Sequence, residues 1–290
     1  VKEDFGFPAG ATVKVVLGAA DQICNTVGTA TVTPGDTVCS TGTVEATTTI
    51  LPKDLTYDQL YRGELPITPT AIKNLYAAMT LLWSGGGALR WFRDTLGKYE
   101  KGLAKKEGRD VYELLIKSSK GSFSKGFFLP HLAGSGTPSW DSTSKGAFLG
   151  LSLATSKKDM VQALLEGITF ELRENLENLE YVGIEPRPIS VIGGGAKSNW
   201  WLQIKADILN KEIRTLKNKE AGCLGAAILA GVSAGVFDSI ENASRDLIEV
   251  EQKFYPDSER SDFYNEKYEI HKTIYSEIRD INRKIDDLTV

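Results

Sequence analysis

The amino-acid sequence predicts one α/β domain in which a mixed sheet is flanked by helices. Three observations lead to this prediction. Short runs rich in Thr and Val fill the first 50 residues, a composition that is typical of strands. Helical spacing of apolar residues begins at residue 69, and beyond residue 156 helices alternate with short strands. With 290 residues, of which 41% are hydrophobic, the chain can bury a sizeable core.

The first 50 residues are expected to form an antiparallel meander. Its candidate strands are the apolar run 13–18, the alternating run 28–33 and the Thr-rich run 36–50. The sequence Pro-Gly-Asp at 34–36 is typical of a tight turn between the second and third strands.

Helices are expected to follow. The run 69–87 has apolar residues at helical spacing, with a proline near its start and three glycines that would end it. Further helices are predicted over 88–99 and 108–120. Residues 121–150 are rich in Gly, Ser and Pro and contain aromatic side chains, which predicts an ordered loop.

The second half of the chain is predicted to alternate between helices and strands. A long amphipathic helix over 156–183 should begin with Ser156 and Asp159 and end at Gly183. A strand, a glycine turn and a helix are expected over 188–210. The remaining predicted elements are a strand at 211–217, a small-residue helix at 221–236 and a closing helix at 258–288. The apolar stripe of the closing helix would consist of Tyr264, Tyr268, Ile274, Tyr275, Ile278 and Ile281.

Charge and composition exclude several classes of protein. The formal net charge of -4 argues against a nucleic-acid-binding protein, which normally carries a basic excess. Three cysteines and two histidines are too few for a disulfide framework or a zinc site, and fit reduced thiols in the cytosol. The apolar stretch 221–237 is interrupted by glycines and is too short to cross a bilayer. We therefore expect a cytoplasmic protein with no membrane partner.

The first motif that could carry chemistry is LGAADQICNTVG, residues 17–28. Asp21 would stand at the carboxyl end of the strand 13–18, among small residues that let a substrate approach the backbone. An exposed carboxylate in that position could act as a general base. The alternative is that Asp21 caps a turn, and this motif alone favours the alternative.

The second motif is Ser-Thr-Gly-Thr at 40–43. Backbone N–H groups together with the hydroxyls of Thr41 and Thr43 would form a phosphate cradle. The alternative is a β-bulge at Gly42, which the motif alone favours.

The third motif is VIGGGAKSNWW, residues 191–201, in which a strand leads through three glycines into a helix. Close approach at Gly194 and Gly195, together with the dipole at the helix N-terminus, would suit a nucleotide. The motif matches neither the dinucleotide-binding pattern nor the P-loop pattern. A glycine turn that serves only tight packing is an equally good interpretation of this motif alone.

Taken together and in this order, the three motifs resemble the C-terminal domain of the FGGY family of carbohydrate kinases, within the actin-like ATPase superfamily. The resemblance is to xylulokinase-like and gluconokinase-like members and covers nearly the whole chain. Its most specific parts are GGGAKSNWWLQIKADILN at 193–210, similar to the adenosine motif, and the middle segment 127–175. The resemblance implies an actin-like ATPase (ribonuclease H-like) fold, with ATP and Mg2+ as cofactors.

The resemblance also implies roles for individual residues. Asp21 would be the catalytic base that takes the proton from the attacking sugar hydroxyl, and Gly42 and Thr43 would contact phosphates. The implied adenosine site consists of Gly194, Gly195, Ala196 and Asn199. No metal ligand is assigned within this chain. Two departures from the family pattern are the alanines at 19–20 and the uncharged sequence at 134–137.

The family has two lobes, and residues 1–290 match only the second, which binds ATP. The start at Val1, without a methionine, agrees with an excised lobe. The implied partners are a sugar or polyol, either pentulose or gluconate-like, and an N-terminal lobe that supplies a second Asp and most of the sugar pocket. We therefore expect little or no kinase activity from this chain alone. Self-association into a homo-oligomer through the face that would meet the other lobe is a further expectation.

Two other functions remain open. One is a stand-alone nucleotide-binding module that senses sugar or ATP without catalysis. The other is a filament-forming actin-like ATPase, against which the Trp-rich adenosine segment and the middle segment argue.

Overall fold

The computed structural model describes residues 6–8, 10, 12–55, 65–121 and 125–288. Their centre is a seven-stranded sheet in the order β3-β4-β2-β1-β7-β8-β9. β1 is parallel to β7 and β7 to β8, whereas the other neighbouring pairs are antiparallel. The predicted mixed sheet is therefore confirmed. Its strands are β1 (Thr37–Thr41), β2 (Glu45–Ile50), β3 (Ile67–Pro69), β4 (Tyr76–Leu82), β7 (Ile189–Gly193), β8 (Ile213–Leu216) and β9 (Val250–Phe254).

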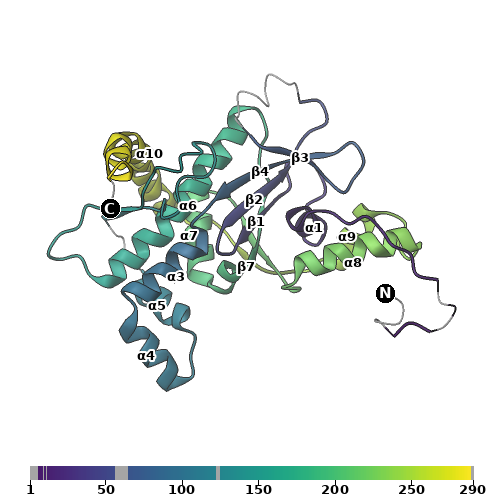
Figure 1. Cartoon of the computed structure of the whole chain (residues 1–290), viewed down its shortest axis with the longest axis horizontal. Coiled ribbons are helices and arrows are strands. Elements are labelled where there is room, and N and C mark those ends of the chain that lie inside the picture. The colour runs from purple at the N-terminus through teal and green to yellow at the C-terminus, as the bar shows by residue number, and fades with distance from the viewer. Residues whose placement is uncertain (1–5, 9, 11, 56–64, 122–124, 289–290) are drawn as a thin grey trace.

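Helices cover both faces of this sheet, with α6 and α7 on one side and α1 and α8 on the other (Figure 1). A second, two-stranded sheet pairs β5 (Phe127–Leu129) with β6 (Ala147–Leu149). The helices are α1 (Asp21–Val27), α3 (Gly85–Thr95), α4 (Lys98–Glu107), α5 (Val111–Ser119), α6 (Lys157–Tyr181), the 3-10 helix η1 (Gly194–Lys197), α7 (Asn199–Leu209), α8 (Ala221–Ala234), α9 (Ile240–Leu247) and α10 (Ser258–Asp286).

The two faces of the sheet are buried in different clusters, because successive residues of a strand point to opposite sides. Cys39 and Val191 belong to the large core that includes residues of α3, α5, α6, α7 and α10. Their chain neighbours Val38 and Ile192 pack on the other face with Leu216. Burial on both faces explains why β1 (TVCST) and β7 (ISVIG) contain no charged residue.

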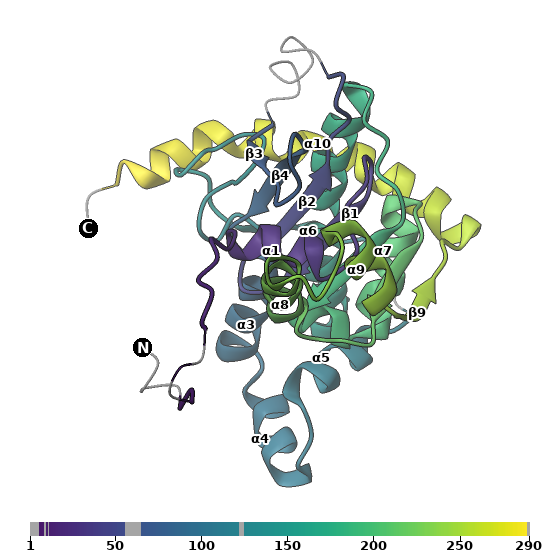
Figure 2. The same cartoon turned by 90° about the vertical axis from the view of Figure 1, so that its right-hand side faces the viewer.

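Close packing of α1 against α8 depends on glycine. A Cβ on Gly28 would lie 1.8 Å from the carbonyl oxygen of Ala221, and one on Gly225 would lie 1.9 Å from that of Cys24. Figure 2 shows α1 and α8 together in front of the sheet. The small-residue composition of α8 is therefore a consequence of its approach to α1.

Most of the predicted second half is confirmed. The Ser156 and Asp159 side chains form a capping box at the start of α6, and Gly183 follows its end with φ +83°. Strand β7, helix α7, strand β8 and helix α8 lie where the sequence predicts them. Tyr264, Tyr268 and Ile274 of the closing helix α10 are buried, but Ile281 is 56% exposed, so its place in the apolar stripe was wrong.

The predicted meander is wrong in two of its three strands. Residues 13–18 are extended without strand pairing, and Val15 and Leu17 are exposed. Residues 28–33 form the irregular end of α1, where the Thr29 hydroxyl donates to the carbonyl oxygen of Asn25 at 2.8 Å. The run 36–50 forms two antiparallel strands, β1 and β2, joined at Gly42.

The helix predicted over 69–87 is also wrong. Its apolar run forms β4, which pairs with β2 and β3 and is buried along most of its length. A continuous apolar run of this length fits either a helix or a central strand, and here strand pairing decides. The glycines at 85–87 begin α3 and do not end a helix.

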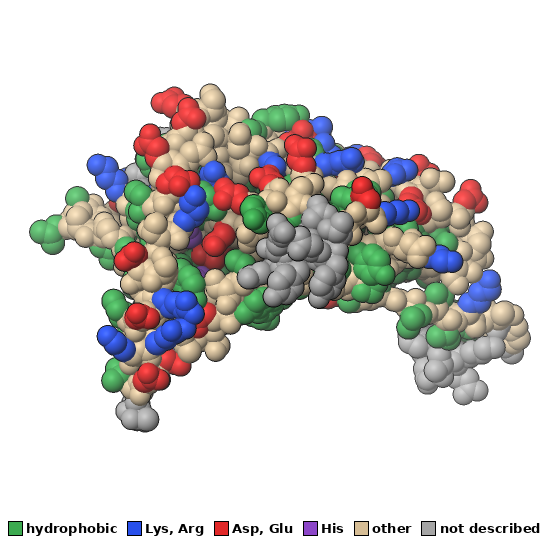
Figure 3. All heavy atoms as spheres, turned by 90° about the horizontal axis from the view of Figure 1, so that it is seen from above, with side chains coloured by type: hydrophobic (Ala, Val, Ile, Leu, Met, Phe, Trp, Pro, Cys, Tyr) green, Lys and Arg blue, Asp and Glu red, His purple; other side chains and the backbone are tan. Residues whose placement is uncertain are grey.

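The loop expected over 121–150 contains β5 and β6 at its two ends, and residues 122–124 lie outside the described part of the chain. Acidic and basic side chains are interspersed over the face seen in Figure 3. Within the described part of the chain, none of the helices combines the length and the apolar character that a bilayer span requires.

Candidate functional site

The two glycine turns that follow β1 and β7 lie side by side at one edge of the sheet. β1 and β7 are parallel neighbours, and their register pairs Thr41 with Gly193, the last residue of each strand. The turns that follow, at 42–43 and 194–195, therefore leave the sheet together. Each exposes its first residue to solvent. The edge formed by the carboxyl ends of parallel strands is where open α/β sheets bind ligands.

The turn at 194–195 lies against β1, and glycine permits this contact. A Cβ on Gly195 would lie 2.4 Å from Cγ2 of Thr41, and a Cβ on Gly193, which has φ +83°, would lie 2.8 Å from the Thr41 carbonyl oxygen. A Cβ on Gly194, in contrast, would meet only that oxygen, at 3.8 Å. Packing inside the chain therefore does not require glycine at 194, where bare backbone leaves room for a ligand.

This turn opens the 3-10 helix η1, and helix α7 follows it from Asn199. The Ser198 hydroxyl accepts a hydrogen bond from the N–H of Trp201 at 3.3 Å and caps the helix. Asn199, the first residue of α7, is exposed, and Ala196 is half-buried. The N–H groups and dipole of a helix N-terminus attract negative charge. The structure thus brings together all four residues predicted to bind adenosine, Gly194, Gly195, Ala196 and Asn199.

A third glycine turn, at 85–87, completes the edge, and sequence reasoning missed it. The N–H of Gly86 donates to the Gly42 carbonyl oxygen at 2.8 Å, and that of Gly87 donates to the Thr43 carbonyl oxygen at 2.9 Å. A Cβ on Gly86 would lie 2.5 Å from the Gly42 oxygen. The start of α3 therefore holds the turn at 42–43 through its backbone.

Asp21 is the first residue of α1 and is exposed, so the prediction that it ends a strand is wrong. The residues before it are extended but unpaired. Ala20 occupies the N-cap position, and Oδ1 of Asp21 accepts a hydrogen bond from the N–H of Gln22 at 2.8 Å. A carboxylate in the first turn is favoured by the helix dipole and is accessible to solvent.

A buried ion pair lies beneath the turns. Nζ of Lys205 on α7 lies 2.9 and 2.8 Å from the two carboxylate oxygens of Glu45, and the Thr41 hydroxyl donates to Oε2 of Glu45 at 2.7 Å. Burial, with a further contribution from Glu45, raises the pKa of the Cys39 thiol to about 11. Cys39 is therefore a neutral thiol at physiological pH.

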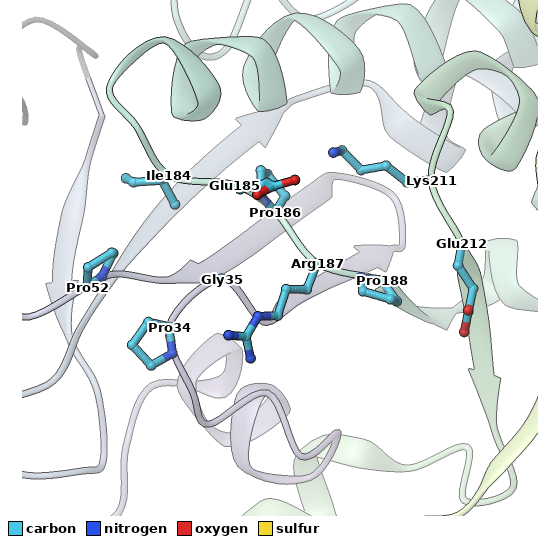
Figure 4. Close-up of a pocket in the computed structure, with 10 residues that line it drawn as sticks. All are labelled: Pro34, Gly35, Pro52, Ile184, Glu185, Pro186, Arg187, Pro188, Lys211 and Glu212. Carbon is cyan, nitrogen blue, oxygen red and sulfur yellow. The ribbon is translucent and has the colours of Figure 1, made fainter.

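A hollow of about 520 Å³ lies at the opposite edge of the sheet, where β1 and β7 begin (Figure 4). Proline rings and the side chains of Arg187 and Lys211 line it. Lys211 forms an ion pair with Glu180 at 2.8 Å. Because the glycine turns follow the other ends of β1 and β7, the hollow is separate from them.

The described residues contain no group of three or more His, Cys, Asp or Glu side chains that could hold a metal ion. Mg2+ in kinase sites is bound by one or two carboxylates, water and substrate phosphates.

The parallel strands β1, β7 and β8, with helices on both faces of the mixed sheet and glycine turns after β1 and β7, have the arrangement of the actin-like ATPase fold. The crystal structure of ligand-bound xylulose kinase from Lactobacillus acidophilus has this fold: it superimposes with a TM-score of 0.83 at 24% identity, over 98% of this chain and 55% of that one. Plasmodium falciparum glycerol kinase with ADP gives a TM-score of 0.71 at 24% identity, over 88% of this chain and 50% of that one.

Residues 37–234 match the C-terminal domain of the FGGY family of carbohydrate kinases, and the chain belongs to this family. Xylulose kinase from Staphylococcus epidermidis is 31% identical over 277 residues, which are 96% of this chain and 54% of that protein. The chain thus spans about half the length of the curated relatives it matches. The resemblance noted in the sequence is confirmed.

Proposed function

We propose that residues 1–290 form the ATP-binding lobe of a carbohydrate kinase that transfers the γ-phosphate of ATP to a sugar hydroxyl. The observation that carries this proposal is the pairing of two bare-backbone turns on the parallel strands β1 and β7. Phosphates would contact Gly42 and Thr43, and adenosine would lie against Gly194, Gly195, Ala196 and Asn199. The glycerol kinase of the same fold was solved with ADP, which supports a nucleotide as the ligand.

In this proposal Asp21 is the general base. Its carboxylate would accept the proton of the sugar hydroxyl as the hydroxyl oxygen attacks the γ-phosphorus and the bond to the β,γ-bridging oxygen breaks. The exposed position of Asp21 at the start of α1 leaves it accessible to a substrate. Phosphoryl transfer is promoted chiefly by positioning and charge neutralisation, and Mg2+ bound with ATP would supply part of the latter.

A second lobe outside this chain would supply most of the sugar pocket and a second carboxylate. The match to only about half of each relative supports this arrangement. The relatives named xylulose kinase favour a pentulose as substrate, and a gluconate-like sugar or a polyol is the alternative. The chain alone would then bind nucleotide but show little kinase activity.

Calorimetric titration with ATP and with ADP, with and without Mg2+, tests nucleotide binding. Gly194→Val places a side chain over exposed backbone without an internal clash, since a Cβ there meets only an oxygen at 3.8 Å. We expect it to abolish binding while the thermal unfolding temperature changes little. Gly102→Val is the matched control, because a Cβ on Gly102 of α4 meets nothing within 4 Å. Binding by both variants, or by neither the variants nor the unmodified chain, would contradict the proposal.

Activity separates the kinase from a module that only senses nucleotide. The chain joined to the parent protein's upstream sequence should phosphorylate a pentulose, measured as ADP release. Nucleotide binding without sugar-dependent ADP release in the joined protein would favour the sensing module.

A further inference from the structure

An ion pair removed from solvent, together with a hydroxyl that donates to it, joins three segments of the chain at the glycine-turn edge of the sheet. Glu45 is the first residue of β2 and Lys205 lies in the middle of α7, 160 residues away in sequence. The exposed fractions of their side chains are 2% and 0%. Nζ of Lys205 also lies 5.2 Å from the centroid of the Trp201 ring.

Such a pair needs an explanation beyond stability. Moving two charges out of water carries a large desolvation penalty, and well-packed apolar residues often stabilise a protein equally well or better. Here both oxygens of Glu45 contact Lys205, and Oε2 also accepts the Thr41 hydroxyl. The arrangement therefore fixes the directions of three side chains from three different elements.

Each of these three residues lies next to a glycine turn or belongs to an element that does. Thr41 directly precedes the turn at 42–43, and its methyl group lies against Gly195 in the neighbouring turn. Glu45 packs against the third turn, because a Cβ on Gly85 would lie 2.6 Å from the Glu45 nitrogen. Lys205 belongs to α7, the helix that follows the turn at 194–195 after the short 3-10 helix η1.

We propose that Lys205 and Glu45 are positioning residues that set the spacing between the turns at 42–43 and 194–195, and through it the affinity for nucleotide. The pair holds Thr41 in place, and Thr41 separates the two turns. This inference rests on the proposed function, because it assigns the turns to one ligand. Neither side chain need touch that ligand.

A structural role and a positioning role give different results in a double variant. Glu45→Gln or Lys205→Met alone leaves a buried charge without its partner, so each single variant should lose stability. Glu45→Gln/Lys205→Met removes both charges and should regain most of the lost unfolding temperature. If the pair positions the turns, affinity will not return with stability, because the carboxylate that Lys205 holds against the Thr41 hydroxyl is still absent.

A second buried ion pair provides the matched control. Glu166 on α6 contacts Lys267 on α10, and their side chains are 1% and 5% exposed. Neither helix contains a residue of the three turns. Glu166→Gln/Lys267→Met therefore removes an equally buried pair, and it should leave nucleotide affinity unchanged.

The test combines ADP·Mg2+ titration calorimetry with amide hydrogen exchange of the nucleotide-free chain. For Glu45→Gln/Lys205→Met we expect about tenfold weaker ADP binding, since small misplacements of binding groups are costly, and faster exchange at the N–H groups of Gly42, Gly86 and Gly87. Equal affinity in this double variant and the unmodified chain would overturn the inference. An equal loss of ADP affinity in the control Glu166→Gln/Lys267→Met would also overturn it.

The unmodified chain separates this inference from the proposed function. If it binds no ADP, the proposed function fails and the inference about affinity falls with it. If it binds ADP and Gly194→Val abolishes that binding, the proposed function stands. The double variant then decides the role of Lys205 and Glu45 alone.

Discussion

The methyl group of Thr41 and the α-carbon of Gly195 are in such close contact that a Cβ on Gly195 would lie 2.4 Å from Cγ2 of Thr41. Thr41 ends β1, and Gly195 follows the end of the parallel strand β7. The contact thus sets the distance between the two turns that we assign to ATP. It also explains why a glycine is needed at a position that is already buried.

Gly195→Ala should destabilise the chain by about 1–3 kcal/mol, since overpacking a closely packed contact has a cost of that size. Thr41→Ser removes the methyl group and should recover part of the loss in the double variant Thr41→Ser/Gly195→Ala. Urea unfolding of the four proteins measures both effects. Purely additive effects of the two substitutions would show that the contact does not control stability here.

Asp21→Asn should leave nucleotide binding by this chain nearly unchanged, because we assign Asp21 to proton transfer and not to ATP. In the proposed two-lobe kinase the same substitution should lower kcat by about 10²- to 10⁴-fold, the usual contribution of a general base. Steady-state kinetics and calorimetry provide the two measurements. A kcat within twofold of the unmodified enzyme would remove Asp21 from the mechanism.

Gly28→Ala should separate α1 from α8, because its Cβ would lie 1.8 Å from a backbone oxygen that cannot rotate away. A clash of this kind belongs with the largest effects of single substitutions, about 4 kcal/mol or more. Gly222→Ala on α8 is the control, since its Cβ would meet only the Asn25 side chain, at 3.1 Å. Thermal unfolding of both variants distinguishes a loss specific to Gly28 from a general intolerance of alanine.

Glu174 should make the chain less stable as the pH rises from about 4 to 7. Burial, together with the charges of Glu171 and Glu177, raises its pKa to about 7, so the folded state retains a proton that the unfolded chain releases at lower pH. The contribution is complete below the pKa of the unfolded chain and is lost as the pH passes 7. Glu174→Gln should therefore raise the unfolding temperature at pH 8 and leave it unchanged at pH 4. Equal effects at both pH values would contradict this assignment.

The sequence predicted the second half of the fold well because its signals are local. The Ser156–Asp159 capping box, the glycine turn after β7 and Gly183 each identify an end of an element by a short-range mechanism. Over residues 188–217 the predicted elements alternate between strand and helix, because two parallel neighbouring strands such as β7 and β8 need a helix to connect them.

The first half of the fold was predicted less well, because strand pairing between distant segments determines which of its residues form strands. The run 76–82 becomes β4 through its register with β2, a relationship that no local pattern contains. Residues 13–18 have strand composition but no strand pairing.

The same division applies to the candidate site. Gly42 and Gly194 were predicted from their motifs and Asn199 from the family resemblance, whereas the contribution of 85–87 depends on contacts between distant segments. Lys205 did carry a signal, because it lies four residues after the buried Trp201 and therefore on an apolar helix face. That spacing indicates a buried partner but cannot identify Glu45.

The central claim is that ATP binds at the edge formed by the turns at 42–43 and 194–195. Its most direct test is a titration of the ¹⁵N-labelled chain with ATP·Mg2+, followed by backbone amide chemical shifts. We predict saturable shifts at Gly42, Thr43, Gly194 and Asn199 and none around the hollow at the opposite edge. Shifts confined to that hollow, or the absence of any shift at the turns, would contradict the claim.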